Sequence, residues 1–262
     1  MPELTPHDAL AHLAWQIELG ANEAILDAPV DRFALDAVPA KPVPATAAPE
    51  PAVDAPTARV IDATEAARTA AGAAPDLPAL KAAMEAFAHC PLKDTARQIV
   101  FADGHPEADL MIVGEAPGRD EDAQGKPFVG RAGQLLDRML AAIGRDRQSP
   151  DPDTGVYITN MLPWRPPQNR DPTPEELSML GPFVRRHIEL AAPRALILMG
   201  NAACQGLTGQ RGITRLRGQW TEVLGRPAIP MFHPAYLLRK PGEKAKAWAD
   251  LLALQARLRD IG

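Results

Sequence analysis

Residues 108–133 read ADLMIVGEAPGRDEDAQGKPFVGRAG. The apolar run at 108–113 predicts a β-strand, the glycine- and proline-rich segment after it predicts a loop, and the apolar period over 131–144 predicts a helix. Open α/β sheets hold ligands in the loops that follow parallel strands, and glycine allows the backbone to approach a ligand closely. We therefore interpret this loop as a candidate active site.

Two other interpretations of this loop start from its turn-forming residues. A phosphate-binding P-loop has the spacing G-x-x-x-x-G-K-S/T. Here six residues separate Gly118 from Gly125, Pro127 follows Lys126, and the loop is acidic, which repels phosphate. The motif therefore argues against a nucleotide triphosphate site. A merely structural turn is the second alternative, because Gly, Pro and Asp are common in turns.

Strand patterns and helix patterns alternate through the body of the chain. Strands are predicted at 108–113, 155–160, 194–199 and 227–232, and helices at 131–144, 174–190, 201–207 and 242–259. This alternation predicts an α/β fold in which a parallel sheet carries helices on both faces. The loops after the first and last strands are then expected at the same edge of the sheet.

The charge of the chain is unevenly distributed. The 262 residues carry a net charge of −5, but residues 1–75 hold eleven acids and four bases, which leaves +2 for the remainder. Residues 201–262 hold ten bases and four acids. Attraction to nucleic-acid phosphates could come from this C-terminal part, although a solvated basic surface explains the same charges.

The composition argues against a membrane or secreted protein. No apolar run approaches the roughly 20 residues that span a bilayer, and the N-terminus lacks the basic and apolar regions of a signal peptide. The two cysteines, Cys90 and Cys204, provide no disulfide framework. We expect a cytoplasmic protein that does not bind a membrane.

The chain divides into three predicted parts. Residues 1–36 form an N-terminal segment, in which an apolar face over 6–25 predicts a short amphipathic helix that could bind a protein partner. Residues 37–61 are rich in alanine and proline and predict a linker. Residues 62–262 are expected to form the catalytic domain, and its first part, 62–88, is predicted to be helical apart from two prolines.

Four segments, in this order, resemble the family 4 uracil-DNA glycosylases. GEAPG and KPFVGRAG within 114–133 match motif A, TNMLPWRPPQNR at 159–170 matches a second family segment, TPEE at 173–176 continues it, and HPAYLLR at 233–239 matches motif B. The match extends from about residue 87 to the C-terminus. The resemblance implies a three-layer α/β/α sandwich with a four-stranded parallel sheet, and it implies excision of uracil from DNA.

Hydrolysis of the bond between uracil and deoxyribose makes three demands on an enzyme. The base must leave the stack, the negative charge on the departing uracil must be stabilised, and the cation-like sugar needs a nearby anion and a water. His233 follows a predicted strand and could donate a hydrogen bond to uracil O2, which is the role that the resemblance implies. A structural histidine that caps the strand is the alternative.

Asn160 and Phe128 are the candidates for base recognition. Asn160 ends a predicted strand, and its amide could read the uracil edge and disfavour cytosine, unless it is a turn residue that bonds its own backbone. Phe128 could stack on the flipped base, as the resemblance implies, unless it belongs to the core. The loop residues expected to complete the substrate site are Gly114, Ala116, Pro117 and Gly118.

Glu115 and Asp120 are the candidates for the anionic group. Glu115 directly follows a strand, and the resemblance places it close to the uracil and the attacking water. Asp120 is the second candidate for polarising water. Glu121 and Asp122 are expected to face solvent or to cap the loop. Which carboxylate acts on water stays open at this point.

Motif B and several arginines are the candidates for DNA contact. Tyr236, Leu237 and Leu238 could form a wedge that fills the gap left by a flipped nucleotide. Inward packing of a first helical turn is the alternative. The candidate phosphate contacts are Arg131, Arg165, Arg170 and Arg239.

The chain departs from the family pattern at the iron–sulfur cluster. Family 4 enzymes typically hold a 4Fe-4S cluster on cysteines, and the resemblance places these at Phe87, Cys90, Trp164 and Leu180. Phenylalanine, tryptophan and leucine cannot ligate iron. We therefore expect a hydrophobic plug in place of the cluster, and neither a cofactor nor a metal.

The covalent uracil-binding branch of the superfamily carries an arginine-rich insert with a histidine after the position of Asn169. This chain has no histidine between His105 and His187, so we expect no covalent adduct. We expect a monomeric, monofunctional uracil-DNA glycosylase that starts base excision repair on uracil-containing DNA. The alternatives are a non-catalytic DNA- or partner-binding module on the same fold, and a glycosylase for another deaminated base such as hypoxanthine.

Overall fold

The computed structural model describes the backbone of residues 56–260 and the side chains of residues 63–260. The predicted helix at 6–25 and most of the predicted linker at 37–61 lie outside the described residues. Among the helices of the described part, none has both the length and the apolar character needed to cross a lipid bilayer.

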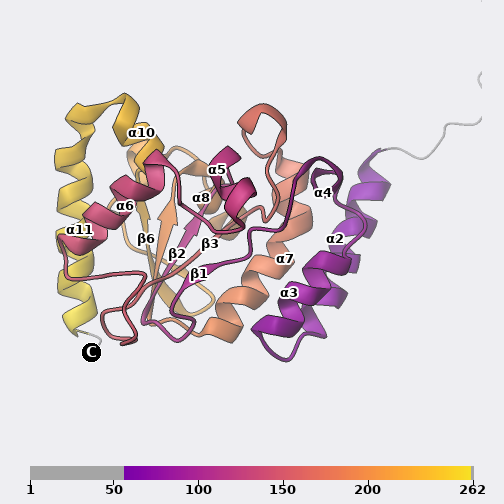
Figure 1. Ribbon diagram of the computed structural model, residues 1–262, viewed down its shortest axis with the longest axis horizontal. Helices are drawn as coiled ribbons and strands as arrows, with labels where there is room; N and C mark the ends of the chain where they lie inside the picture. Colours follow the sequence, from indigo (N-terminus) through magenta and orange to yellow (C-terminus); the bar gives the residue numbers. More distant parts are fainter. Residues whose placement is uncertain (1–55, 261–262) are drawn as a thin grey trace, which may run out of the picture. The chain divides into compact units, whose positions relative to one another are not determined.

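A mixed six-stranded sheet forms the centre of the fold (Figure 1). Its inner strands are parallel and lie in the order β3 (Tyr157–Asn160), β2 (Leu110–Gly114), β4 (Ala195–Met199) and β6 (Arg226–Met231). These are the four predicted strands, with ends that differ by one or two residues at most. The register pairs Gly114 with Asn160, so the two residues sit side by side at the carboxyl edge.

Two short antiparallel strands extend this sheet beyond the predicted four. They are β1 (Asp103–Gly104), which pairs with β3, and β5 (Thr221–Val223), which pairs with β6. The prediction of a four-stranded sheet was therefore correct for the parallel strands and too low for the whole sheet. Strands of two and three residues are too short to show the apolar alternation that identifies a strand in a sequence.

Helices cover both faces of the sheet, which is the middle of three layers (Figure 1). One face carries α6 (Arg131–Ala141) and α11 (Lys244–Asp260), and the other carries α7 (Pro174–Ala191) and α8 (Asn201–Thr208). The predicted α/β/α sandwich is confirmed.

Strand β2 shows how the sequence supports two cores at once. Leu110 and Ile112 pack into the cluster that includes α6 and α11 residues, whereas Met111 and Val113 pack into the cluster on the α7 side. All four side chains are fully buried. A strand that is apolar at every position is typical of a parallel sheet covered on both faces.

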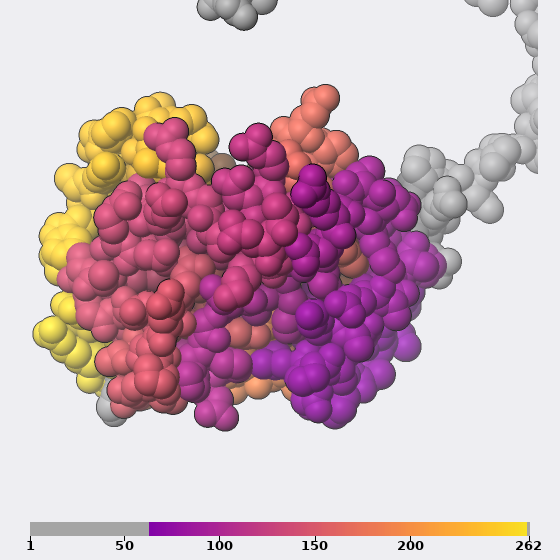
Figure 2. Space-filling view, viewed as in Figure 1, coloured from indigo at the N-terminus to yellow at the C-terminus, as the bar shows by residue number. Residues whose placement is uncertain are grey.

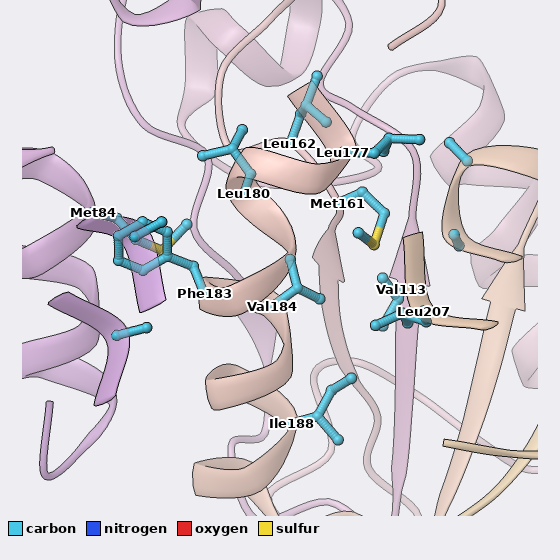
Figure 3. Close-up of a cluster of buried hydrophobic side chains, with 14 of the residues drawn as sticks. Met84, Val113, Met161, Leu162, Leu177, Leu180, Phe183, Val184, Ile188 and Leu207 are labelled. Carbon is cyan, nitrogen blue, oxygen red and sulfur yellow. The ribbon is translucent and has the colours of Figure 1, made fainter. Parts of the chain in front are cut away.

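The core on the α7 side is built around one amphipathic face of that helix (Figure 3). Leu180, Phe183, Val184 and Ile188 recur at three- and four-residue spacing and are fully or almost fully buried. Figure 3 shows Phe183 pointing toward Met84, while Val184 and Ile188 point toward the strands. The helix therefore holds the sheet on one side and the N-terminal helices on the other.

Two N-terminal helices, α2 (Pro56–Gly72) and α3 (Leu77–Ala86), lie against α7. The predicted helical region at 62–88 is interrupted between them, where the Asp76 side chain caps α3 by accepting a hydrogen bond from Ala79 N at 2.8 Å. Helix α2 begins six residues before the predicted domain boundary at residue 62. Residues 56–61 of the predicted linker are therefore helical, and Pro56 is compatible with this because proline is tolerated in the first turn of a helix.

Short helical segments occupy most of the remaining connections. They are α4 (Leu92–Thr95), α5 (Arg119–Gln124), η2 (Pro167–Asn169), α9 (Ile213–Leu216), α10 (Pro234–Arg239) and η3 (Pro241–Glu243). Helix α5 begins after a four-residue loop from β2, and α10 begins after a two-residue loop from β6, so both motifs reach the carboxyl edge of the sheet.

Candidate active site

A cavity of about 180 Å³ opens at the carboxyl ends of β2, β3 and β6. The predicted site residues that line it are Glu115, Ala116, Pro117, Gly118, Phe128, Asn160, Arg170 and His233. The residues that line it without having been predicted are Glu121, Ala132, Pro166, Asn169 and Ala235. Hollows of about 440 and 590 Å³ exist elsewhere in the described part of the chain, but neither contains a predicted catalytic residue.

His233 enters the cavity as a neutral hydrogen-bond donor. It precedes α10, and its Nδ1 accepts a hydrogen bond from Ala235 N at 3.2 Å. Because Nδ1 acts as the acceptor, the proton of the neutral ring is on Nε2. Burial, with a smaller contribution from the positive charge of Arg239, lowers the pKa of His233 from 6.5 to about 4. At neutral pH the ring is therefore uncharged and presents an N–H.

Asn160 brings an unpartnered polar atom to the same cavity. Its side chain is buried, and Oδ1 is the one buried side-chain nitrogen or oxygen in the described residues that has no hydrogen-bond partner. A buried acceptor left without a partner costs about 1–3 kcal/mol. Such a cost is explained at a site where a ligand supplies the missing donor.

Gly114 allows Asn160 and Phe128 to approach each other behind this cavity. A Cβ atom at residue 114 would overlap Asn160 Oδ1 and would lie 2.5 Å from Phe128 Cε2. Any side chain here would collide with Asn160 and Phe128, so the position requires glycine. The predicted role of Gly114 in the substrate site is thus indirect: it makes room.

Phe128 presents its ring next to the imidazole. The Phe128 and His233 rings are stacked, with centroids 5.3 Å apart and planes 28° from parallel. Phe128 adopts a left-handed backbone conformation, with φ of 54°, which is uncommon for a residue other than glycine. The side chain is buried in the core cluster on the α6 side and also lines the cavity, and its stacking on a flipped base stays a prediction.

Glu115 and Asp120 lie in different surroundings. Burial raises the pKa of Glu115, the negative charge of Asp171 raises it further, and the positive charge of Arg239 opposes both. Asp120 does not line the cavity; its side chain is 52% exposed and forms an ion pair with Arg119 at 3.6 Å. The geometry therefore favours Glu115 over Asp120 as the anionic group.

Glu121 holds motif A in shape. Its carboxylate accepts backbone hydrogen bonds from Gly118 at 3.1 Å and from Val129 and Gly130 at 2.9 Å each. The prediction that Glu121 caps the loop is confirmed. Its Gly-x-x-Glu spacing, which resembles a capping box, is a signal that could have identified its place beside the cavity.

Asp122 does not face solvent, contrary to one of the two predictions for it. The side chain is buried and accepts a hydrogen bond from Arg97 N at 2.8 Å. Asp122 therefore ties α5 to the segment that precedes β1. A helix of six residues has too few turns for a sequence pattern to identify its buried face.

The predicted DNA-contacting leucine is wrong at Leu237. Helix α10 turns Leu237 inward, where it is buried in a cluster with Leu135, Phe232 and Ala247. Tyr236 and Leu238 are partly exposed and remain available as a wedge.

Two of the four predicted phosphate contacts are exposed and form no ion pair with any residue in the described part, namely Arg131 and Arg239. Arg170 forms a two-point ion pair with Glu176, at 2.6 and 2.9 Å, and Arg165 donates to Asn169 Oδ1 at 2.7 Å. These two arginines order the loop before α7, and Arg170 also lines the cavity.

The residues at the four cluster positions do not fit an iron–sulfur cluster. Phe87, Cys90, Trp164 and Leu180 are all buried in one apolar cluster. Phe87 packs edge-on against Phe183, with ring centroids 5.2 Å apart. Burial raises the pKa of the Cys90 thiol to about 11, which disfavours a thiolate ligand. Within the described residues, no group of three or more His, Cys, Asp or Glu side chains is placed to hold a metal ion.

Known proteins share this sequence over the region that builds the site. Residues 101–252 match the family model of the Uracil DNA glycosylase superfamily. The Type-4 uracil-DNA glycosylase of Archaeoglobus fulgidus is 42% identical over 161 residues, which cover 58% of this chain and 78% of that protein.

Two further relatives agree. The Type-4 uracil-DNA glycosylase of Thermotoga maritima is 40% identical over 153 residues, which cover 57% of this chain and 77% of that protein. The Type-4 uracil-DNA glycosylase of Sulfurisphaera tokodaii is 35% identical over 165 residues, which cover 58% of this chain and 71% of that protein. The chain therefore belongs to the uracil-DNA glycosylase superfamily, and within it is similar to the type-4 enzymes.

Proposed function

We propose that this protein hydrolyses the N-glycosidic bond of uracil in DNA and so starts base excision repair. The observation that best supports this proposal is the unpartnered Oδ1 of Asn160, a residue that lines the same cavity as the neutral His233 ring and the Phe128 ring. The match covers 78% of one Type-4 uracil-DNA glycosylase and 77% of another, which supports the same reaction for this chain.

Recognition of the base follows from the amide and the aromatic ring. A flipped uracil stacks on Phe128, while Asn160 Oδ1 accepts from uracil N3–H and the amide nitrogen donates to O4. Cytosine presents an unprotonated N3 and an amino group at these two points. It would leave the buried amide unpartnered, and an unmade buried hydrogen bond discriminates strongly.

Bond cleavage depends on His233. As the bond between C1′ and N1 breaks, the electron pair moves to the uracil, and negative charge grows on O2. The Nε2–H of His233 donates to this oxygen. A fixed donor stabilises charge that develops in the transition state more than it stabilises the bound substrate.

Glu115 completes the reaction on the sugar side. Its carboxylate stabilises the cation-like sugar and accepts a proton from the water whose oxygen bonds to C1′. The raised pKa of Glu115 makes it a stronger base than an ordinary surface glutamate. The products are uracil, which leaves as an anion, and an abasic site.

The test uses oligonucleotides that are identical except for one base. Purified protein is incubated with DNA containing uracil, thymine or hypoxanthine at the same position and then treated with hot alkali, which breaks the strand at an abasic site. We expect a break at uracil alone. Binding without any break would favour the non-catalytic module, and a break at hypoxanthine alone would favour a glycosylase for another base.

Other features of the function stay predictions. They are a monomeric state, a cytoplasmic location, a protein partner for the N-terminal segment, and contact of Arg131, Arg239, Tyr236 and Leu238 with DNA.

A further inference from the structure

We infer that Arg147 is a positioning residue, which holds Phe128 in the conformation that presents its ring to the flipped base. The inference rests on the proposed function, because it concerns the same cavity. Arg147 belongs to the loop between α6 and β3, which lies outside motif A and motif B in the sequence, and its side chain is only 8% exposed. Figure 2 shows this loop on the surface at the lower left, beneath α6.

The guanidinium of Arg147 donates to two consecutive carbonyls of the motif A loop. One terminal nitrogen donates to Pro127 O at 2.9 Å, and the other donates to Phe128 O at 3.0 Å. The same group is held between two carboxylates, Asp137 at 2.7 Å and Asp103 at 3.2 Å. Arg147 therefore connects helix α6, through Asp137, and the edge strand β1, through Asp103, to the backbone of Phe128.

Phe128 needs such support because its backbone is strained. Its φ of 54° lies in the left-handed region, which side chains other than glycine rarely adopt. Its carbonyl also presses closely against α6, where a Cβ atom at Gly133 would overlap both the carbonyl oxygen and its carbon. The absent side chain at Gly133 and the two donors of Arg147 together define where the Phe128 peptide lies.

Arginine suits this role better than lysine. Its planar head offers five donors in a fixed fork, so it can serve two carbonyls and two carboxylates at once. An ammonium group has three donors on a flexible stem. A lysine at residue 147 would keep an ion pair with Asp103 or Asp137 but would lose the fork that reaches both carbonyls.

The expected consequence is a defect in base capture. With Arg147→Lys, the Phe128 peptide can relax from the left-handed conformation, and a smaller fraction of the free protein presents the ring correctly. The apparent affinity falls by that fraction. We expect the KM for uracil-containing DNA, and the inhibition constant of free uracil, to rise by about tenfold. The kcat should change by less than about threefold, since His233 and Glu115 stay in place.

A double-mutant cycle separates positioning from a general stabilising role. The variants are Arg147→Lys, Phe128→Leu and both together, with Arg145→Lys as the matched control. Arg145 lies two residues away and donates to Gly155 O at 3.5 Å, without a contact to Phe128. If Arg147 acts through the ring, Arg147→Lys should have almost no effect on KM once Phe128 is leucine. The Arg145→Lys protein should match the wild type.

Two results would overturn the inference. One is that Arg147→Lys raises KM equally whether residue 128 is phenylalanine or leucine and also lowers the melting temperature. Arg147 would then stabilise the fold in general rather than position Phe128. The other is an unchanged KM and an unchanged uracil inhibition constant in Arg147→Lys. A wild-type protein that does not excise uracil would instead contradict the proposed function. Direct binding of free uracil to the wild type and to Arg147→Lys still tests the positioning role in that case.

Discussion

Replacement of His233 by alanine tests the centre of the proposed mechanism. The substitution removes the Nε2–H donor at the position where charge develops on uracil. The usual loss for one donor of this kind is roughly 10²–10³ in rate, and we expect single-turnover excision to slow by this factor. The affinity for uracil-containing DNA should change little, because the donor acts mainly on the transition state.

The same substitution has a structural cost that can be calculated separately. His233 Nδ1 caps α10 through Ala235 N, and loss of a side-chain cap costs about 1 kcal/mol. For a domain of this size, that corresponds to a fall in melting temperature of about 2–4 °C. His233→Asn supplies a good capping side chain again, so it should restore most of the stability but not the excision rate.

The assay is single-turnover release of uracil with excess enzyme, together with thermal unfolding of each variant. A slow but stable His233→Asn protein would support a role in the chemistry. A His233→Asn protein that regains both stability and rate would mean that the histidine is only a cap. Undiminished excision by His233→Ala would remove this residue from the mechanism and leave Glu115 as the main candidate.

The remaining predictions concern recognition, pH, the cluster and the N-terminal region. Asn160→Asp should excise uracil more slowly and discriminate less against cytosine, because a carboxylate can accept from the cytosine amino group; competition between uracil- and cytosine-containing DNA measures this, and unchanged selectivity would argue against the amide as the reader of the base. The free energy of unfolding should fall as the pH drops below 6.5, because burial lowers the pKa of His187 to about 3 and that of His233 to about 4. Between these values and pH 6.5 the unfolded chain binds more protons than the folded protein, so acid favours unfolding. Urea unfolding at pH 7.5 and at pH 5 measures the difference in stability, and equal stability at both would contradict the prediction. Protein purified without air should contain no stoichiometric iron or sulfide, since Cys90 is the single cysteine at the four cluster positions; iron and sulfide at cluster ratios would overturn the hydrophobic plug. A truncation that starts at Pro56 should retain excision, because it preserves the whole of α2; near-complete loss in a folded protein would assign the preceding residues to the catalytic body.

The layered fold was predictable because its signals are local. Strand β2, its glycine-rich loop and helix α6 follow one another in 32 residues, from residue 110 to residue 141, and each has its own local sequence pattern. The two central parallel strands, β2 and β4, carry no polar side chain and are buried along their whole length, because both of their faces are covered. By contrast, β1 and β5 form because a neighbouring strand offers hydrogen-bonding groups. A segment of two or three residues is too short for an alternating pattern to predict such a strand.

The identity of the central site residues was also predictable, through the resemblance of motifs A and B. Glu115, Phe128, Asn160 and His233 meet in one cavity as expected. The prediction failed where a residue's role depends on which way a short helix faces. Leu237 turns inward because Leu135 and Phe232 offer it an apolar surface, and both lie outside motif B.

The sequence by itself determined which side chains reach the carboxyl edge, since strand order and spacing place motif A and motif B there. The tertiary structure alone decided their chemical states: the neutral Nε2–H tautomer of His233, the raised pKa of Glu115 and the unpartnered amide of Asn160. It also decided the conformation of Phe128, which Arg147 holds from 19 residues away. The physical reason is that burial, partners and charge at each atom come from contacts between segments far apart in the chain, and no local pattern of residues records those contacts.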